Sequence, residues 1–178
     1  MSNKKTTVPV FVDVEANGPS PVTHSLIQIG ARALTGEGFK ADLKPRDGAK
    51  VNPAALKAIG LTHEETMEYP DHGLGMFNFN SWLVTTFTIR GIRPVFWSDN
   101  PAFDWQFING YFSLHEYKNP FGFSARRIGD LYAGLNKDIN NSNSWKKLRK
   151  TKHTHDALDD ATGNMEAFAA IKERFNLP

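Results

Sequence analysis

The chain has 178 residues, of which 40% are hydrophobic and 12% aromatic, and a formal net charge of +2. The length and composition fit one globular domain with a sizeable core, while so small a net charge says little about partners. There is no cysteine, which excludes disulfides, thiolate zinc sites and cysteine nucleophiles.

The N-terminal segment predicts neither secretion nor membrane insertion. The start, MSNKKTT, carries two lysines but no apolar segment follows, and the chain has no run of eighteen apolar residues. Together with the absence of cysteine, this predicts a cytoplasmic protein without a membrane span. We expect residues 1–7 to form a short polar tail and residues 8–178 to form a single domain.

Three short strands are expected first. Residues 8–14 are rich in β-branched side chains, residues 25–34 read SLIQIGARAL, and residues 38–43 alternate apolar and polar side chains. Glycine and proline separate these segments, as at Gly18 and Gly36. Three such strands in succession predict an antiparallel meander.

Helices and one further strand follow. Thr62 and Glu65 have the spacing of a capping box, and residues 76–89 have helical spacing of apolar side chains. Residues 94–98 predict a strand and residues 101–114 a helix. One face of that helix would carry Phe103, Phe107, Tyr111 and Leu114.

The last part of the chain contains a polar segment and a long helix. Residues 136–144 are rich in asparagine and predict a mobile loop, and residues 156–174 predict a helix. The apolar face of this helix would carry Ala161, Met165, Phe168, Ile171 and Phe175. Three strands followed by alternating helix and strand imply an α/β fold with a mixed sheet.

Two acids end the first predicted strand, in the stretch VPVFVDVEANG. Asp13 and Glu15 are two positions apart, so their side chains point to the same face. Paired carboxylates repel each other and resist burial, and a divalent cation between them would relieve this. A solvated strand end explains the pair equally well when the pair is taken alone.

Further acids begin two of the predicted helices. Asp104 lies in the first turn after the 94–98 strand, where an acid is also favoured by the helix dipole, and Asp99 suits a cap or turn. His155 and Asp160 lie at the start of the final helix. Taken singly, capping and a surface position would explain each of them.

The ordered combination is more specific. D-x-E ends a strand, N-x-x-F-D follows a central strand, and H-x-A-x-x-D opens a late helix. The chain thereby resembles the DEDDh 3′–5′ exonucleases, the superfamily of proofreading subunits, ribonuclease T and oligoribonuclease. The matching residues are Asp13, Glu15, Asn100, Phe103, Asp104, His155, Ala157 and Asp160.

This resemblance implies a ribonuclease H-like fold and a hydrolytic mechanism. Two divalent cations, Mg²⁺ or Mn²⁺, would be held by Asp13, Glu15, Asp104 and Asp160. His155 would take a proton from the attacking water, and nucleoside 5′-monophosphates would leave from single-stranded 3′ ends. Two positions depart from the usual pattern, since relatives often have Thr or Ser at Ala16 and His at Asp99.

Substrate contacts are expected beside these residues. Five cations occur within seven positions, Lys146, Lys147, Arg149, Lys150 and Lys152, directly before His155. Such a strip suits phosphate binding, although a solvated surface is the alternative. The resemblance adds Ala16, Asn17, Asn100 and Phe103 as further contacts, while the four-residue spacing of Phe103 and Phe107 also suits core packing.

Two other functions remain open at this point. One is a nucleic-acid-binding module that has lost activity, and the other is a proofreading subunit that acts only with a polymerase. The presence of all five active-site residues argues against the first. The resemblance also implies a possible homodimer.

Overall fold

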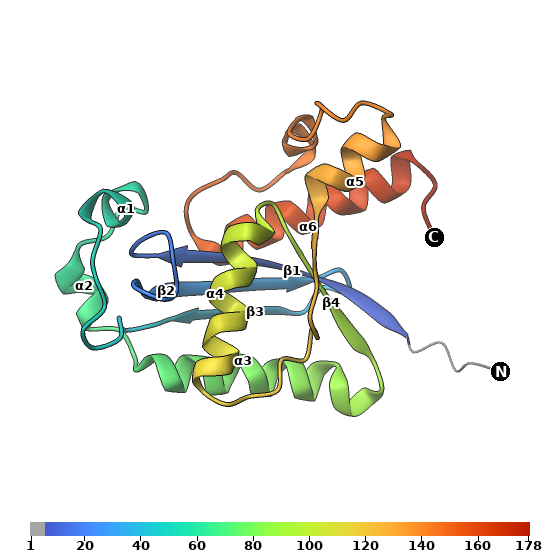
Figure 1. The fold of residues 1–178 in the computed structure, drawn as a ribbon. Helices are drawn as coiled ribbons and strands as arrows, with labels where there is room; N and C mark the ends of the chain where they lie inside the picture. Colours follow the sequence, from blue (N-terminus) through green and yellow to red (C-terminus); the bar gives the residue numbers. More distant parts are fainter. Residues whose placement is uncertain (1–5) are drawn as a thin grey trace.

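Residues 6–178 are described in the computed structural model, and they form a central sheet with helices on both faces (Figure 1). The strands are β1 (Thr7–Ala16), β2 (Leu26–Ala33), β3 (Gly38–Asp42), β4 (Arg93–Ser98) and β5 (Ala125–Arg127). The helices are α1 (Pro53–Ala58), α2 (His63–Met67), α3 (His72–Thr86), α4 (Pro101–Leu114), α5 (Ile128–Leu135) and α6 (Ala157–Arg174), with 3₁₀ turns η1 (Thr88–Arg90) and η2 (Ser144–Leu148).

The sheet is mixed, as the sequence predicts. Its strand order is β3-β2-β1-β4-β5. The pairs β1–β2 and β2–β3 are antiparallel, whereas β1–β4 and β4–β5 are parallel. Both the α/β class and the three-stranded meander are therefore confirmed. Within residues 6–178, no helix has the combination of length and hydropathy that crossing a bilayer requires.

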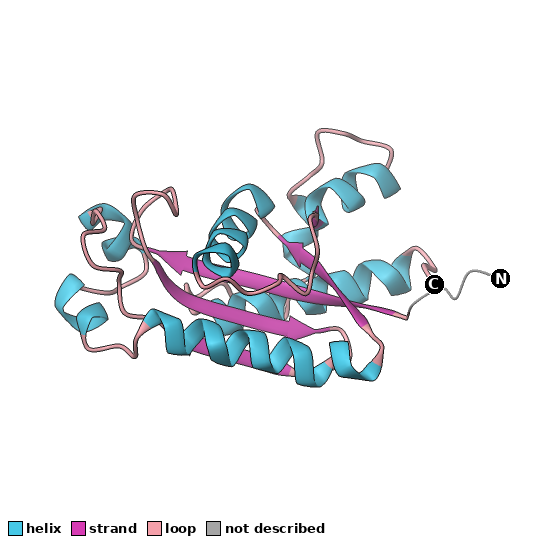
Figure 2. Ribbon diagram, turned by 60° about the horizontal axis from the view of Figure 1, so that its bottom comes forward, coloured by secondary structure: helices cyan, strands magenta, loops and turns pink. Residues whose placement is uncertain are grey.

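Alternation along β1 builds a core on each face of the sheet. Val10 and Val12 face α3 and α4, where they join one buried apolar cluster. Phe11 faces the other way and packs with Trp97 and Phe168 in a second cluster, which α5, η2 and α6 complete. Figure 2 shows α3 running along the sheet. Because β1 is central and both its faces are covered, its end is held rigidly.

Several predicted boundaries move in the structure. Thr7, assigned to the tail, begins β1 because it pairs with Arg93; residues 1–5 of the predicted tail lie outside the described part of the chain. Helix α3 begins at His72 and not at residue 76, since Asp71 caps it by accepting the N–H of Gly73. Of the side chains predicted to share one face of α4, Phe107 and Tyr111 are buried, whereas Leu114 at the end of the helix is 48% exposed.

Short elements were missed where the periodic signal was weak. β5 has three residues, too few to show alternation, and exists because β4 pairs with it in parallel. α1 carried a usable signal, because the Asn52 side chain caps it and Pro53 occupies its first turn. The capping box of Thr62 and Glu65 is present as predicted.

A glycine sets how closely α6 approaches the sheet. A Cβ atom on Gly30 of β2 would lie 2.0 Å from the carbonyl carbon of Ala157 and 2.3 Å from the nitrogen of Leu158. These are backbone atoms of the first turn of α6, so rotation of a side chain cannot relieve the contact. Gly30 therefore fixes the start of α6 against the sheet.

We expect Gly30→Ala to lower the free energy of unfolding by about 3 kcal/mol, because overpacking here must displace a helix. Gly134→Ala is the matched control. Gly134 lies in α5, and apart from its chain neighbours and the backbone of its own helix, no described atom lies within 4 Å of a Cβ built there. In this control the free energy of unfolding should rise by about 0.5–1 kcal/mol. Urea unfolding of both variants measures the difference, and equal stabilities would contradict the packing argument.

Candidate active site

β1 places the first two acids on the face of the sheet that α6 covers. Asp13 pairs with Gly30 and Glu15 with Gln28 of β2, and the register shifts between Glu15 and Ala16. Such a bulge redirects the end of a strand and is common next to active sites. Both carboxylates follow the direction of Phe11, so the predicted shared face is confirmed.

Two helix starts add the other acids. Asp104 lies in the first turn of α4, is 4% exposed, and its Oδ1 accepts the N–H of Val14 at 3.3 Å. Asp160 lies in the first turn of α6 and is 1% exposed. One oxygen each of Asp13, Glu15 and Asp160 lies within 4.8 Å of the others. Three chain segments thus converge at the end of β1.

His155 stands at the rim of this cluster. Its Nδ1 lies 3.6 Å from Oε1 of Glu15, and its side chain is 44% exposed. Its φ is +60°, a region where histidine is several-fold enriched among non-glycine residues. Asp160 supports this conformation, since its oxygens accept the N–H groups of His155 at 3.1 Å and Thr154 at 3.3 Å. The fourth acid therefore also positions the histidine.

Burial and neighbouring charges raise the pKa of Asp13, Glu15 and Asp104. Burial raises the pKa of Glu15 to about 8, with the charges of Asp160, Asp104 and Asp156 adding to it. Burial, followed by the charges of Asp104, Glu15 and Asp160, raises the pKa of Asp13 well above its usual range. Burial raises the pKa of Asp104 to about 7, although hydrogen bonds such as that from Val14 oppose the shift. Without cations, part of the cluster is protonated at neutral pH.

This donor set fits hard divalent cations. Carboxylate oxygens are the ligands that Mg²⁺ and Mn²⁺ prefer, and cations would offset the repulsion that raises these pKa values. Asp13, Glu15 and Asp160 supply the compact oxygen cluster. Asp104 lies close enough for its charge to raise the pKa of both Asp13 and Glu15.

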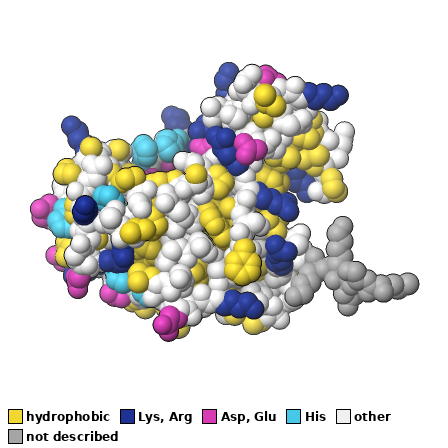
Figure 3. Space-filling model, viewed as in Figure 1, with side chains coloured by type: hydrophobic (Ala, Val, Ile, Leu, Met, Phe, Trp, Pro, Cys, Tyr) yellow, Lys and Arg dark blue, Asp and Glu magenta, His cyan; other side chains and the backbone are white. Residues whose placement is uncertain are grey.

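The basic strip lies beside the acids. A cleft of about 310 Å³ is lined by Asp99, Lys146, Arg149, Lys150, Thr151, Lys152 and His153. Lys146 forms an ion pair of 2.5 Å with Asp99 and remains 45% exposed. In Figure 3, histidine atoms gather where the chain between η2 and α6 runs in Figure 1, with Lys and Arg atoms nearby. The strip therefore borders the candidate site.

Arg149 differs from the rest of the strip. Its side chain is only 10% exposed, lies over the ring of Trp145, and donates to Asn164 of α6. Its Nη1 lies 3.9 Å from Oδ1 of Asp160. Arg149 was predicted to bind phosphate with the rest of the strip, but its side chain lies buried near the acids, where it acts as a counter-charge. Lys147, Lys150 and Lys152 are exposed, as phosphate binding requires.

The other predicted substrate contacts also differ in how exposed they are. Asn17 is fully buried, and its Oδ1 accepts the N–H of Ser25 at 2.6 Å, so the structure gives its side chain a role in the turn after β1. Ala16 is 5% exposed. Asn100 is exposed at the start of α4, while Phe103 is half-buried against Phe107 with ring centres 5.1 Å apart.

Sequence reasoning missed two contacts around the site. His153 Nδ1 lies 2.7 Å from Oδ1 of Asp160, although only its neighbour His155 belongs to the motif. Glu166 of α6 accepts the N–H groups of Lys150 at 3.0 Å and Thr151 at 2.7 Å. Proximity to His155 was the available signal for His153, whereas Glu166 carried none because its role depends on how α6 packs.

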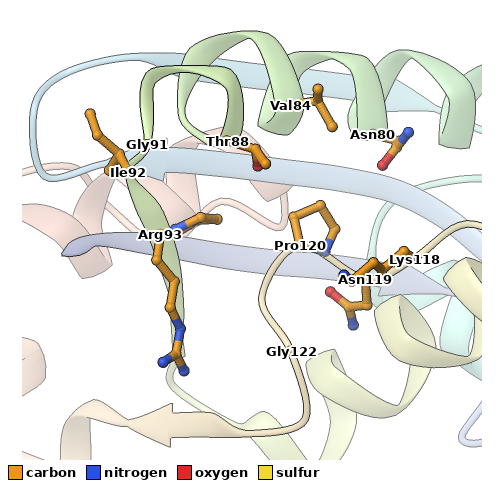
Figure 4. A pocket seen from close by; sticks show the side chains of 11 residues that line it. Asn80, Val84, Thr88, Gly91, Ile92, Arg93, Lys118, Asn119, Pro120 and Gly122 are labelled. Atoms are coloured by element: carbon orange, nitrogen blue, oxygen red, sulfur yellow. The ribbon is translucent and has the colours of Figure 1, made fainter. Parts of the chain in front are cut away.

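A larger cavity lies away from the acids. It measures about 450 Å³ and sits between α3, η1, the start of β4 and the loop after α4 (Figure 4). Arg93 and Pro94 line it at the opposite end of β4 from Ser98. Its lining contains neither a carboxylate nor a histidine, so the chemistry belongs at the other end of the strand.

This sheet order, with four acids and a histidine around the end of β1, gives the chain the ribonuclease H-like fold of exonucleases. A family model described as Exonuclease (RNase T) matches residues 10–168, and the chain belongs to this family.

Individual relatives agree with this assignment. The 3′-5′ DNA exonuclease Cap18 of Escherichia coli is 34% identical over 175 residues, which cover 91% of this chain and 90% of that protein. The nuclease domain of 3′hExo, a DEDDh family member bound to rAMP, superimposes with a TM-score of 0.74 at 15% identity, covering 98% of this chain and 95% of that one. The zinc-bound complex of Escherichia coli ExoI with single-stranded DNA has a TM-score of 0.74 at 20% identity. It covers 96% of this chain, which spans only 41% of ExoI.

The raised pKa values predict how pH changes the stability of the metal-free protein. The unfolded chain loses these protons near the ordinary values of 4.5 for Glu15 and 3.8 for Asp104, whereas the folded chain keeps them until about 8 and about 7. Rising pH therefore favours the unfolded state across this interval. We expect Tm in a chelator to fall from pH 5 to pH 8, and added Mn²⁺ to raise it most at pH 8.

Asp104→Asn tests the cause, since it removes one charge with little change in volume. Its metal-free Tm should fall less with pH than that of the original chain. Asp47→Asn, at an exposed position, is the control and should leave the slope unchanged. Parallel slopes in all three proteins, measured by calorimetry, would show that the acids are not mutually repelling in the folded state.

Proposed function

We propose that this chain is a metal-dependent 3′–5′ exonuclease that acts on single-stranded DNA. The observation that carries the proposal is the oxygen cluster of Asp13, Glu15 and Asp160 at the end of β1, with His155 at its rim. The name of Cap18 favours DNA as the substrate. The ExoI complexes with single-stranded DNA support an unpaired strand.

Hydrolysis would break the bond between phosphorus and the 3′ oxygen. Two divalent cations, Mg²⁺ or Mn²⁺, when bound by Asp13, Glu15, Asp104 and Asp160, would stabilise the attacking and leaving oxygens. His155 accepts the proton of the attacking water, since its exposed ring stands 3.6 Å from Glu15 at the rim of the acids. The products are a nucleoside 5′-monophosphate and a strand one nucleotide shorter, with a new 3′-hydroxyl.

Asp160 has two duties in this scheme. Its carboxylate belongs to the oxygen cluster, and it also accepts the backbone N–H groups of Thr154 and His155. The backbone at His155 is consequently held beside the acids before substrate arrives. Such preorganisation matters because small misplacements of a catalytic group cost rate heavily.

The exposed lysines of the strip would hold the strand leading away from the site. Lys146, Lys147 and Lys150 are exposed around η2, next to the cleft that reaches His153. Cations that track a phosphate backbone bind without reading sequence. We therefore assign them to binding and not to the hydrolytic step.

Digestion of a 5′-labelled strand tests the function. Linear single-stranded DNA should shorten progressively with Mg²⁺ or Mn²⁺, and a circle of the same sequence should persist, because the enzyme needs a 3′ end. A matched RNA strand should be degraded more slowly than the DNA. The Asp104→Asn protein serves as the inactive control. The proposal would be contradicted if the circle were cut, or if the Asp104→Asn protein were as active as the original chain.

Charge removal tests the strip. A variant with Lys146, Lys147 and Lys150 changed to Ala should bind single-stranded DNA more weakly and lower the slope of log K against log salt by about 2, at roughly 0.7 for each phosphate that a lysine no longer neutralises. The rate on saturating substrate should change much less. A variant of equal charge change at Lys57, Lys118 and Lys137, all exposed and remote from the cleft, is the control. Equal salt slopes in the two variants would show that the strip is a solvated surface that does not bind the strand.

A further inference from the structure

The loop before α6 brings two imidazoles to one carboxylate. One potential ligand atom each of His153, His155 and Asp160 lies within 4.8 Å of the others. The closest pair is His153 Nδ1 and Asp160 Oδ1, at 2.7 Å, and the centres of the two histidine rings are 4.3 Å apart. His153 is outside the family motif and has no part in the proposed hydrolysis.

We propose that His153, His155 and Asp160 form a site for a transition-metal ion of the Zn²⁺ class, distinct in its ligands from the all-oxygen cluster. Two imidazole nitrogens and one carboxylate oxygen are a common protein ligand set for Zn²⁺, and they leave a fourth position for water. Mg²⁺, by contrast, prefers oxygen ligands and is a poor match for imidazole.

The geometry needs only a small adjustment. Two ligand atoms of one tetrahedral Zn²⁺, with bonds of about 2.0–2.2 Å, lie roughly 3.4 Å apart, so His153 Nδ1 and Asp160 Oδ1 must open slightly from 2.7 Å to admit the ion. The side chains of His153 and His155 are 55% and 44% exposed, which leaves them room to rotate. Asp160, at 1% exposed, is the fixed member of the set.

Occupation of this site would inhibit the enzyme. The ion would occupy the nitrogen lone pair of His155, which hydrolysis requires for proton transfer. It would also bind one oxygen of Asp160, which hydrolysis requires in the oxygen cluster. This consequence rests on the proposed function, whereas metal binding itself does not. Zn²⁺ should therefore inhibit the Mg²⁺-supported reaction while Mg²⁺ is in large excess.

Calorimetric titration of Zn²⁺ into the tag-free protein tests the site directly, without nucleic acid and with excess Mg²⁺ present. One Zn²⁺ should bind per chain. His153→Ala should weaken binding at least about tenfold, since even indirect partners of a metal site are worth this much. His153→Gln should do the same although it can still donate to Asp160, which separates ligation from positioning. His63→Ala, on α2, is the control and should bind as the original chain does.

Two readouts complete the test. Co²⁺ in place of Zn²⁺ should give a visible absorption band that His153→Gln loses and His63→Ala keeps. Zn²⁺ should inhibit DNA digestion by the original chain and by His63→Ala more strongly than digestion by His153→Gln. Equal Zn²⁺ affinities for His153→Gln and the original chain would overturn the site. A chain that binds Zn²⁺ through His153 but digests no DNA would overturn the proposed function alone.

Discussion

Mutual repulsion among Asp13, Glu15, Asp104 and Asp160 is the constraint around which the structure is arranged. Burial makes ionisation of Asp13 and Glu15 harder, and the charges of the neighbouring acids add to the effect. A flexible scaffold would relieve this repulsion by letting the acids separate. Here β1 is paired on both sides, Gly30 lets α6 lie close to β2, and Val14 donates to Asp104. Core packing thus holds together a group whose electrostatics oppose it.

The small net charge conceals a segregation of charge within the fold. The acids are gathered at the end of β1, while the lysines around η2 remain exposed next to them. Arg149 lies between the two groups as a buried cation near Asp160. An anionic strand would thus meet positive charge first at the surface and the acids only below it. Composition alone cannot show this, because the opposite charges nearly cancel in the sum.

Sequence patterns predicted the parts of the site that depend on local periodicity. The two-residue spacing of Asp13 and Glu15 placed them on one face, and ordered motifs singled out Asp104, His155 and Asp160. The burial of Arg149 was not predicted, because its partners Asn164 and Asp160 come from α6 and a run of cations does not reveal which member is buried. Asn17 was predicted as a substrate contact, and nothing in the sequence indicated that its side chain bonds to Ser25. β5 escaped prediction because three residues carry no period.

The loop between η2 and α6 is tied to α6 at two points. Glu166 holds Lys150 and Thr151 near its start, and Asp160 holds Thr154 and His155 near its end. The positions of Lys150 and His155 therefore depend on the position of α6. A chimera between relatives would therefore have to exchange this loop and α6 together. If the loop were grafted without Asp160 and Glu166, its sequence would be kept, but the hydrogen bonds that set its conformation would be lost.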